Sequence, residues 1–250
     1  DKDVREPLEK FKKKIKSKIF YENKKVTTRK RRFVENAYNK KISEVYFMDD
    51  NLLGLKNKKK ILSYLKKEIS KFDAVILIDY GHGFIDNDIY NILRQKAKFL
   101  AINCQTNSAN LGFNLITKYP VSDFICIDEP ELRLAASNNI SEIEEIVKNQ
   151  ITKKIKCKNI TITRGRNGSF SYSNSNVFNT PALISDKVID TIGAGDVFLV
   201  ITSLLYSTKS DQLVTNIIGN IAGDLKVDIL GHSKSISRSN FYAVLNHVIK

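Results

Sequence analysis

A glycine-rich turn with an acid at each end is the stretch of this sequence best suited to chemistry. It runs from Val188 to Phe198 and reads VIDTIGAGDVF. An apolar run from Val197 to Tyr206 follows at helix length, so the turn is predicted to lead into a helix N-terminus. Small residues let the backbone approach a ligand, and the first turn of a helix leaves N–H groups that can bind phosphate.

Asp196 closes this turn, where its carboxylate would lie beside the bound anion. A negative charge is unfavourable there unless it performs chemistry. Taking the proton from a hydroxyl that attacks a phosphoryl group is such a task. The alternative is that Asp196 only caps the helix, since Asp is a good N-cap residue.

The string DTIGAGDVF resembles the signature of the ribokinase/PfkB carbohydrate kinases. The resemblance implies that Asp196 is the catalytic base and that the amides of Gly193, Ala194 and Gly195 form an anion hole for the transferred phosphate. It also implies ATP and Mg²⁺ as cofactors. A sugar or sugar phosphate is the implied substrate.

Composition limits the other classes of function. No apolar run approaches the roughly 18 to 20 residues that cross a bilayer, so we expect a cytoplasmic protein without a membrane partner. The net charge of +14 could indicate a nucleic-acid partner. No nucleic-acid motif accompanies the lysines, so we do not expect the protein to bind nucleic acid. The positive field would instead favour anionic substrates. The three cysteines lack the spacing of a zinc site, which predicts reduced thiols.

Strand and helix patterns alternate along most of the chain, which predicts an α/β fold with a mainly parallel sheet. The family resemblance implies a ribokinase-like three-layer sandwich whose nucleotide-binding core spans residues 72–250. The predicted strands are 74–78, 99–104, 123–127 and 159–163, and the predicted helices are 57–71, 86–98, one beginning near Pro130, 141–153, 197–206, 211–227 and one from Ser239.

The N-terminal region is more basic. Apolar residues at helical spacing predict an amphipathic helix over residues 5–19, and residues 25–35 and 41–49 are predicted to be strands. The segment VTTRKRRFV resembles the T-T-x-K-x-R segment of sugar-phosphate kinases of the ADP-heptose synthase type. Residues 25–50 would then form part of a small β-lid, and Thr28, Lys30 and Arg32 would contact a sugar phosphate. The alternative is an exposed basic edge strand that resists aggregation.

Polar residues follow two of the predicted strands, where ligands bind in parallel sheets. Asp79 and His82 follow the first strand and Asn103 ends the second, so all three are candidate substrate contacts. His82 could equally be a turn residue. The related heptose-phosphate kinases have D-Y-x-K-G and D-P-K-G at these places, whereas this chain has DYGHG and NCQT, so the substrate could differ.

Cation ligands are implied at two places. Asp128 and Glu131 stand where the family has N-x-x-E and would hold Mg²⁺, directly or through water, because Mg²⁺ prefers oxygen ligands. An acidic helix start stabilised by the helix dipole is the alternative. Asp190 begins the signature and corresponds to a residue that helps to hold a monovalent cation in some relatives, so K⁺ is a further candidate. Ile192 stands where many relatives have Thr, which leaves that requirement open.

The nucleotide side is predicted from two weaker resemblances. The segment TRGRNG resembles the T-x-G-x-x-G of the family, so Thr163 and Gly165 would border ATP. Asn220, Gly223 and Gly231 resemble the family's adenine pocket. An ordinary hairpin turn and plain close helix packing are the respective alternatives.

The resemblance covers roughly residues 20–250, a single PfkB-type kinase domain that lacks its N-terminal part. No G-G-x-x-x-N pattern, which contacts the sugar in relatives, occurs between Asp1 and Asn36. Either the chain is a fragment, as of a larger bifunctional protein, or the sugar site is completed differently. We predict ATP-dependent phosphorylation of a sugar or sugar phosphate of the heptose 7-phosphate type. A non-catalytic domain that serves assembly or regulation is the rival, and a homodimer stays open.

Overall fold

The main sheet of the computed structural model has six strands in sequential order. The structure describes residues 8–9, 11, 13–22, 25–35, 40–49, 51–183, 188–231 and 233–249. Strands β3 to β6 run parallel, and β7 and β8 return antiparallel at one edge. The strands are β3 (Val75–Asp79), β4 (Leu100–Cys104), β5 (Val121–Asp128), β6 (Lys156–Thr163), β7 (Ser169–Ser173) and β8 (Asn176–Thr180).

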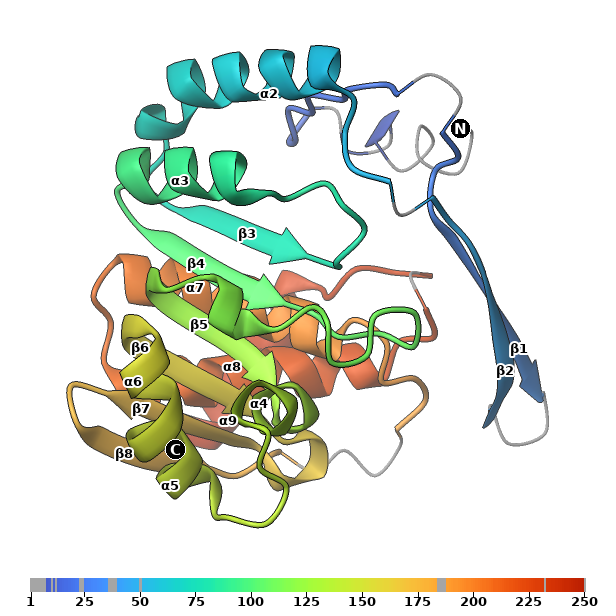
Figure 1. Cartoon of the computed structure of the whole chain (residues 1–250). Helices are drawn as coiled ribbons and strands as arrows, with labels where there is room; N and C mark the ends of the chain where they lie inside the picture. Colours follow the sequence, from blue (N-terminus) through green and yellow to red (C-terminus); the bar gives the residue numbers. More distant parts are fainter. Residues whose placement is uncertain are drawn as a thin grey trace.

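Helices cover both faces of this sheet, so the fold has three layers (Figure 1). One face carries α2 (Leu55–Glu68), α3 (Asn87–Lys96), α4 (Glu129–Ala136) and the run α5 (Ile143–Ile146), η3 (Val147–Ile151) and α6 (Thr152–Lys154). The other carries α7 (Ala194–Ser207) and α8 (Gln212–Val227), with α9 (Arg238–Ile249) packed on α8. Short 3₁₀ turns are η1 (Ile69–Lys71), η2 (Ile116–Lys118) and η4 (Gly165–Asn167). The predicted α/β class, the mainly parallel sheet and the predicted elements from β3 onward are confirmed.

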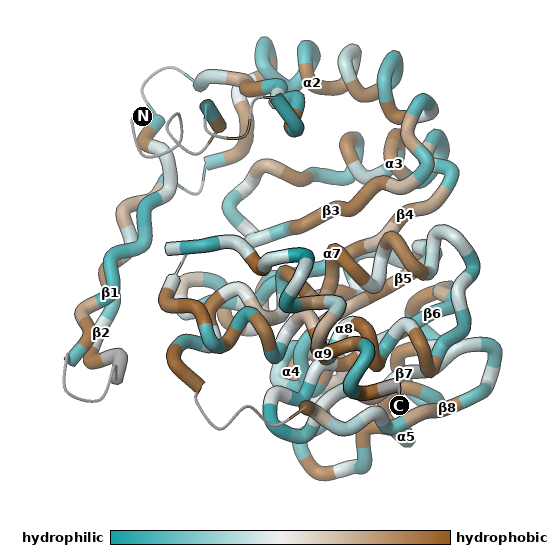
Figure 2. The backbone as a smooth tube through the Cα atoms, turned by 180° about the vertical axis from the view of Figure 1, so that it is seen from behind, coloured by the Kyte–Doolittle hydropathy of each residue, from teal (hydrophilic) through white to brown (hydrophobic). Residues whose placement is uncertain are grey.

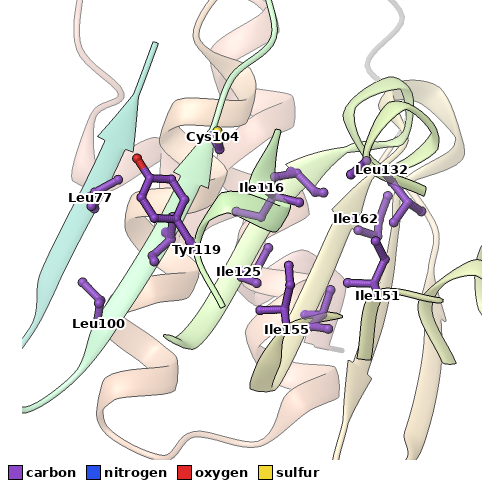
Figure 3. Close-up of a cluster of buried hydrophobic side chains, with 14 of the residues drawn as sticks. Leu77, Leu100, Cys104, Ile116, Tyr119, Ile125, Leu132, Ile151, Ile155 and Ile162 are labelled. Carbon is purple, nitrogen blue, oxygen red and sulfur yellow. The ribbon is translucent and has the colours of Figure 1, made fainter. Parts of the chain in front are cut away.

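Alternate residues of the central strands supply two separate cores. Leu100 and Ile102 of β4 face the layer of α2 to α5 and belong to one core with Ile125 and Ile162. Figure 3 shows Leu100, Ile125 and Ile162 of this core on successive strands. Ala101 lies between Leu100 and Ile102 and faces α7 in the second core, together with Phe124 of β5. Because both faces are buried, the middle of each strand is apolar, at residues 100–102 of β4 and 124–127 of β5 (Figure 2).

A separate two-stranded sheet extends to one side of the main sheet (Figure 1). It consists of β1 (Arg29–Glu35) and β2 (Lys40–Phe47), which pair antiparallel. The two predicted strands are therefore confirmed, whereas their role as a lid stays a prediction. The Ser108 hydroxyl, in the loop after β4, donates to Glu44 Oε1 of β2 at 3.2 Å. This bond ties the hairpin to the sheet.

The predicted helix over residues 5–19 is wrong in its second half. Leu8, Glu9 and Phe11 are helical, but residues 15–20 have no regular secondary structure. Ile15 and Ile19, which were to lie on the buried face, are exposed. Most helical stability in proteins comes from packing an apolar face, and this segment packs little of it. Residues 5–7, 10 and 12 lie outside the described residues.

Two further expectations concern the whole chain. Throughout the described ranges, no helix is both long and apolar enough to span a membrane. Cys104 and Cys126 are buried, Cys157 is half-buried, and all three are free thiols. Burial raises the pKa of each thiol.

Close packing of α7 on α8 generates a stability prediction. A Cβ at Gly219 would lie 2.6 Å from Thr202 Cγ2 and 2.7 Å from Phe198 Cε2, so Gly219→Ala must displace α7. One turn later, a Cβ at Gly223 would meet only the Ala194 carbonyl at 3.8 Å. We expect Gly219→Ala to lower the free energy of unfolding by about 1–2 kcal/mol, despite the better helix propensity of Ala. Gly223→Ala, the matched control, should raise it by up to about 1 kcal/mol.

Urea unfolding of the two variants measures the difference. An equal or greater stability of Gly219→Ala than of Gly223→Ala would contradict the tight α7–α8 contact.

Candidate active site

A cavity of about 570 Å³ opens at the carboxyl ends of the parallel strands. Residues after β3 and at the carboxyl ends of β4, β5 and β6 line it, together with the start of α7 and the β1–β2 hairpin. The residues that line it are Thr28, Lys30, Arg32, Tyr46, Tyr80, His82, Asn103, Gln105, Thr106, Asn107, Cys126, Ile127, Asp128, Glu131, Thr163, Ile192, Gly193, Gly195 and Asp196. The cavity therefore gathers most of the predicted catalytic, metal and substrate residues.

The start of α7 presents backbone to this cavity. Gly193 is the N-cap and has a left-handed φ of +81°, which favours glycine and turns the chain into the helix. A Cβ at Gly195 would meet nothing within 4 Å, so the protein itself does not require glycine there. Gly193 and Gly195 line the cavity, whereas Ala194 does not, and its N–H donates to the Thr191 carbonyl at 3.3 Å. Of the three residues predicted to supply amides, two line the cavity.

Asp196 lies in the first turn of α7 and also faces the cavity. Its Oδ1 accepts a 3.1 Å hydrogen bond from Gln105 Nε2, in the loop after β4. Its charge adds to the effect of burial in raising the pKa of Tyr80, so Tyr80 lies nearby. The carboxylate is thus held by a neutral partner and stays directed toward the cavity.

Asp128 and Glu131 form a capping box at the start of α4. Asp128 Oδ1 accepts from the Glu131 N–H at 2.7 Å, and Glu131 Oε2 accepts from the Asp128 N–H at 3.0 Å. Glu131 Oε1 accepts from the Thr106 N–H at 3.0 Å. Burial, and then the charge of Asp128, raise the pKa of Glu131 from 4.5 to about 7. Burial also raises the pKa of Asp128.

The hairpin makes the opposite end of the cavity basic. Lys30 and Arg32 lie 3.3 and 3.4 Å from the carboxylate of Glu44, and the Lys30 ammonium lies 4.7 Å from the centre of the Tyr46 ring. Tyr46 donates to the same carboxylate at 2.8 Å. Two cations share one acid, which leaves positive charge toward the cavity. Thr28 also lines this end.

Two of the three candidate substrate contacts at the strand ends line the cavity, and the third does not. His82 and Asn103 line the cavity, and Asn103 Nδ2 donates to the Cys126 carbonyl at 2.8 Å. Asp79 is buried outside the cavity lining. Its carboxylate accepts from the Gly81 N–H at 2.9 Å and from the Tyr119 hydroxyl at 2.8 Å, and pairs with Lys118. The structure therefore gives Asp79 a role in fixing the turn after β3.

The residues predicted to bind the nucleotide also differ in whether they line the cavity. Thr163 lines the cavity, and Gly165 begins the next turn with a φ of +53°. Asn220 is buried and donates to the carbonyls of Thr180 and Pro181, at 3.2 and 3.0 Å. Gly223 packs near Ala194. Neither of these two residues of α8 is among the cavity-lining residues, so their adenine contact stays a prediction.

Comparison with known proteins now decides the family. The family model described as pfkB family carbohydrate kinase matches residues 26–207. The chain belongs to the pfkB family of carbohydrate kinases.

Curated relatives of this pfkB chain carry the name bifunctional protein HldE. The protein from Aliarcobacter butzleri is 24% identical over 92% of this chain and 48% of its own length. That from Helicobacter hepaticus is 23% identical over 68% of this chain and 35% of its own length. The chain thus spans half or less of the length of these relatives.

Solved structures with the same fold include two sugar kinases. Phosphofructokinase-2 from Escherichia coli, in complex with potassium, has a TM-score of 0.67 at 12% identity, over 83% of this chain and 67% of that one. Ribokinase from Arabidopsis thaliana, complexed with ribose and ATP, has a TM-score of 0.61 at 14% identity, over 81% and 65%. The predicted ribokinase-like fold is confirmed.

The residues of the pfkB chain fit a hydrated Mg²⁺. Among the described residues, no group of three or more His, Cys, Asp or Glu side chains could enclose a metal. Mg²⁺ commonly keeps several waters and takes one or two carboxylates with substrate phosphates, so a closed cage is not needed. Both oxygens of Glu131 already accept backbone N–H groups, so Asp128 is the better direct ligand and Glu131 fits a contact through water.

K⁺ fits less well at Asp190. Asp190 Oδ1 accepts from the Ile192 N–H at 2.9 Å, and Oδ2 accepts from the Gly231 N–H at 2.8 Å. Gly231, predicted to border the nucleotide, instead links Asp190 to the chain after α8 with a φ of +50°. The Asp190 carboxylate thus links the turn before α7 to the segment after α8.

Gln105, Tyr80 and Tyr46 are among the cavity residues that the sequence analysis did not name as candidates. The sequence carried a signal for Gln105 and Tyr80, since both lie in polar segments that follow a strand. The polar run 105–110 follows β4, and the amides of Asn107 and Asn110 both donate to the Tyr80 carbonyl at 2.9 Å. These bonds hold the loops after β3 and β4 side by side. Tyr46 is one aromatic residue among several in its strand and carried no separate signal.

The raised pKa of Glu131 generates a pH prediction. Between about pH 4.5 and 7 the folded protein keeps a proton on Glu131 that the unfolded chain releases, so this group's contribution to stability falls as the pH rises. Glu131→Gln removes the titration. Between pH 5 and 8, wild type should lose about 2–3 kcal/mol of unfolding free energy relative to the variant.

Urea unfolding at both pH values measures this difference, and a pH-independent cost of the lost hydrogen bond cancels. Glu129→Gln is the control, because Arg133 lowers the pKa of Glu129 in spite of burial, so it is ionised throughout this range. Parallel pH dependences of wild type and Glu131→Gln would contradict a proton on Glu131.

Proposed function

We propose that this pfkB chain carries the catalytic machinery of an ATP-dependent kinase for a sugar or sugar phosphate, with Asp196 as the general base. The observation that carries the proposal is the position of Asp196. Its carboxylate faces the same cavity as the backbone of Gly193 and Gly195 and is oriented by Gln105 at 3.1 Å. A base and an anion-binding turn on one helix start are the two parts that phosphoryl transfer to an alcohol needs.

In this proposal the sugar hydroxyl approaches between Asp196 and the transferred phosphate. Asp196 accepts the hydroxyl proton as the oxygen attacks the γ-phosphorus of ATP in line, and the bond from that phosphorus to the bridging oxygen breaks to release ADP. The N–H groups of Gly193 and Gly195 would stabilise the charge on the phosphoryl oxygens, because N–H groups at a helix start have no intrahelical partner. The Ala194 N–H already donates to the Thr191 carbonyl. The nucleophile is an ordinary alcohol, so no covalent enzyme intermediate is needed.

The substrate class follows from the basic end of the cavity. Lys30 and Arg32 face it and exceed the charge of their shared partner Glu44. A phosphate on the sugar, away from the reacting hydroxyl, would find two cations there. The similarity to bifunctional HldE proteins supports a heptose 7-phosphate type of substrate.

Asp128, with Glu131 through water, would hold Mg²⁺ at the acidic end. When bound, the ion neutralises phosphate charge that these carboxylates would otherwise repel. Thr163 and Gly165 would border the nucleotide.

One observation favours a rival. Asn103 and Gln105 stand where heptose-phosphate kinases have the Asp and Lys of D-P-K-G, so a cation and an acid of the resembling site are replaced. A non-catalytic domain, serving assembly or regulation in a larger protein, would tolerate such changes. It would still bind ATP, so turnover is the measurement that separates the two.

ADP release across a panel of sugars and sugar phosphates, heptose 7-phosphate included, tests the proposal. We expect turnover with one substrate class, reduced roughly 10²- to 10⁴-fold in Asp196→Asn. Asn keeps an oxygen for the Gln105 bond but cannot take the proton. Asp211→Asn, which changes the N-cap of α8 by the same substitution, is the control and should keep its rate. Silence of folded, ATP-binding wild type on every substrate favours the rival.

The basic end generates a second prediction. Lys30→Ala and Arg32→Ala should each raise KM for a sugar phosphate about tenfold or more, with little change in KM for ATP. Arg31 lies between them on the opposite face of β1, where its guanidinium lies 5.7 Å from the centre of the Phe47 ring. Arg31→Ala removes the same charge from the hairpin and should leave both constants unchanged. Equal effects of all three variants would point to overall charge in place of a phosphate site.

A further inference from the structure

Lys226 is a buried lysine in the last turn of α8, with 5% of its surface exposed. Its ammonium donates to the Ile229 carbonyl at 3.3 Å and to the Gly231 carbonyl at 3.0 Å. A buried charge is costly unless it is paired or hydrogen-bonded, and an ammonium offers three donors. Both carbonyls belong to the segment just after α8, which ends at Val227. Lys226 therefore fastens the chain that leaves α8.

The same chain segment fastens the turn before Gly193. The Gly231 N–H donates to Asp190 Oδ2 at 2.8 Å, while its carbonyl accepts from Lys226. The N–H groups of Ile189 and Asp190 donate to the Val227 carbonyl at 2.9 and 3.0 Å. Asp190 Oδ1 accepts from Ile192, which directly precedes Gly193. A continuous series of bonds thus runs from the Lys226 ammonium to the start of α7.

Backbone carbonyls beside a carboxylate are also the ligands that a monovalent cation would use. Here the two carbonyls already accept from a fixed ammonium, which carries the same single positive charge. Both Asp190 oxygens already accept backbone N–H groups. An added K⁺ would meet a like charge and ligands that are in use.

We propose that Lys226 is a positioning residue that takes the place of a monovalent cation, so that the anion-binding turn before α7 is held without K⁺. The bonds of Lys226 lie at the candidate K⁺ site beside Asp190, and they argue against K⁺ as its occupant. Lys226 borders a second cavity of about 630 Å³ between α7, α8 and α9, so an ion could reach the site once the ammonium is removed.

Thermal unfolding in KCl and in choline chloride, at equal ionic strength, tests the proposal without any assay of activity. Wild type should unfold at the same temperature in both salts. Lys226→Ala, which leaves room among the carbonyls, should unfold several degrees lower in choline chloride and recover in KCl. Lys226→Met fills the space with an apolar chain and should be lower in both salts. A lysine that only stabilises the fold would give no rescue specific to K⁺.

The activity arm rests on the proposed kinase function. ADP release by wild type should change less than about twofold between the salts, and that of Lys226→Ala should rise about tenfold or more in KCl. If no substrate is turned over, the kinase proposal fails and the unfolding temperatures still decide the role of Lys226. A K⁺-specific stabilisation of wild type overturns the inference, and this result needs no variant to fold. Identical behaviour of Lys226→Ala and Lys226→Met in both salts also overturns it.

Discussion

The position of α7 is the constraint on which the cavity depends. Its first turn must meet the ends of β4 and β5, and its length must stay against the sheet. Phe198 and Leu199 anchor it in the core formed with Ala101 and Phe124, and Gly219 lets α8 lie close behind it. Because protein interiors are densely packed, α7 cannot slide without opening a void or a clash. The backbone at Gly193 and Gly195 is therefore presented by a fixed support.

Charge in the cavity is divided between two ends. Asp128, Glu131 and Asp196 gather where the strands end, and Lys30 and Arg32 lie on the hairpin. Burial raises the pKa of Asp128 and Glu131, and Asp196 contributes to the rise at Glu131. Close carboxylates resist simultaneous ionisation, so the acidic end is poised to take a cation or a proton. Glu44 limits the positive charge at the other end.

Local sequence patterns predicted most helices and strands but not which residues contact one another across the fold. Strands β4 and β5 could be predicted because burial on both faces leaves apolar residues in succession, at 100–102 and 124–127. Helix α4 could be predicted because Pro130 and its acids suit a helix start. The prediction of a helix over residues 5–19 was wrong in its second half, because apolar spacing indicates a helix face but not whether another element packs on that face. Gln105 and Asp196 are 91 residues apart in the chain, so no spacing rule connects them. Lys226 looks in the sequence like any solvated lysine of a helix.

The departures from the resembling kinases gain a physical meaning from these contacts. A lysine at position 105 would set a full positive charge against Asp196 and hold its carboxylate as a tight ion pair. The amide of Gln105 orients the carboxylate and adds no positive charge beside it. Under the proposed function, the positive charge that the phosphates need must then come from elsewhere in the cavity. In that proposal the amides of Gly193 and Gly195, the hairpin cations and a metal ion held by Asp128 would supply it, so the missing charge at position 105 would make phosphate binding depend more strongly on these three.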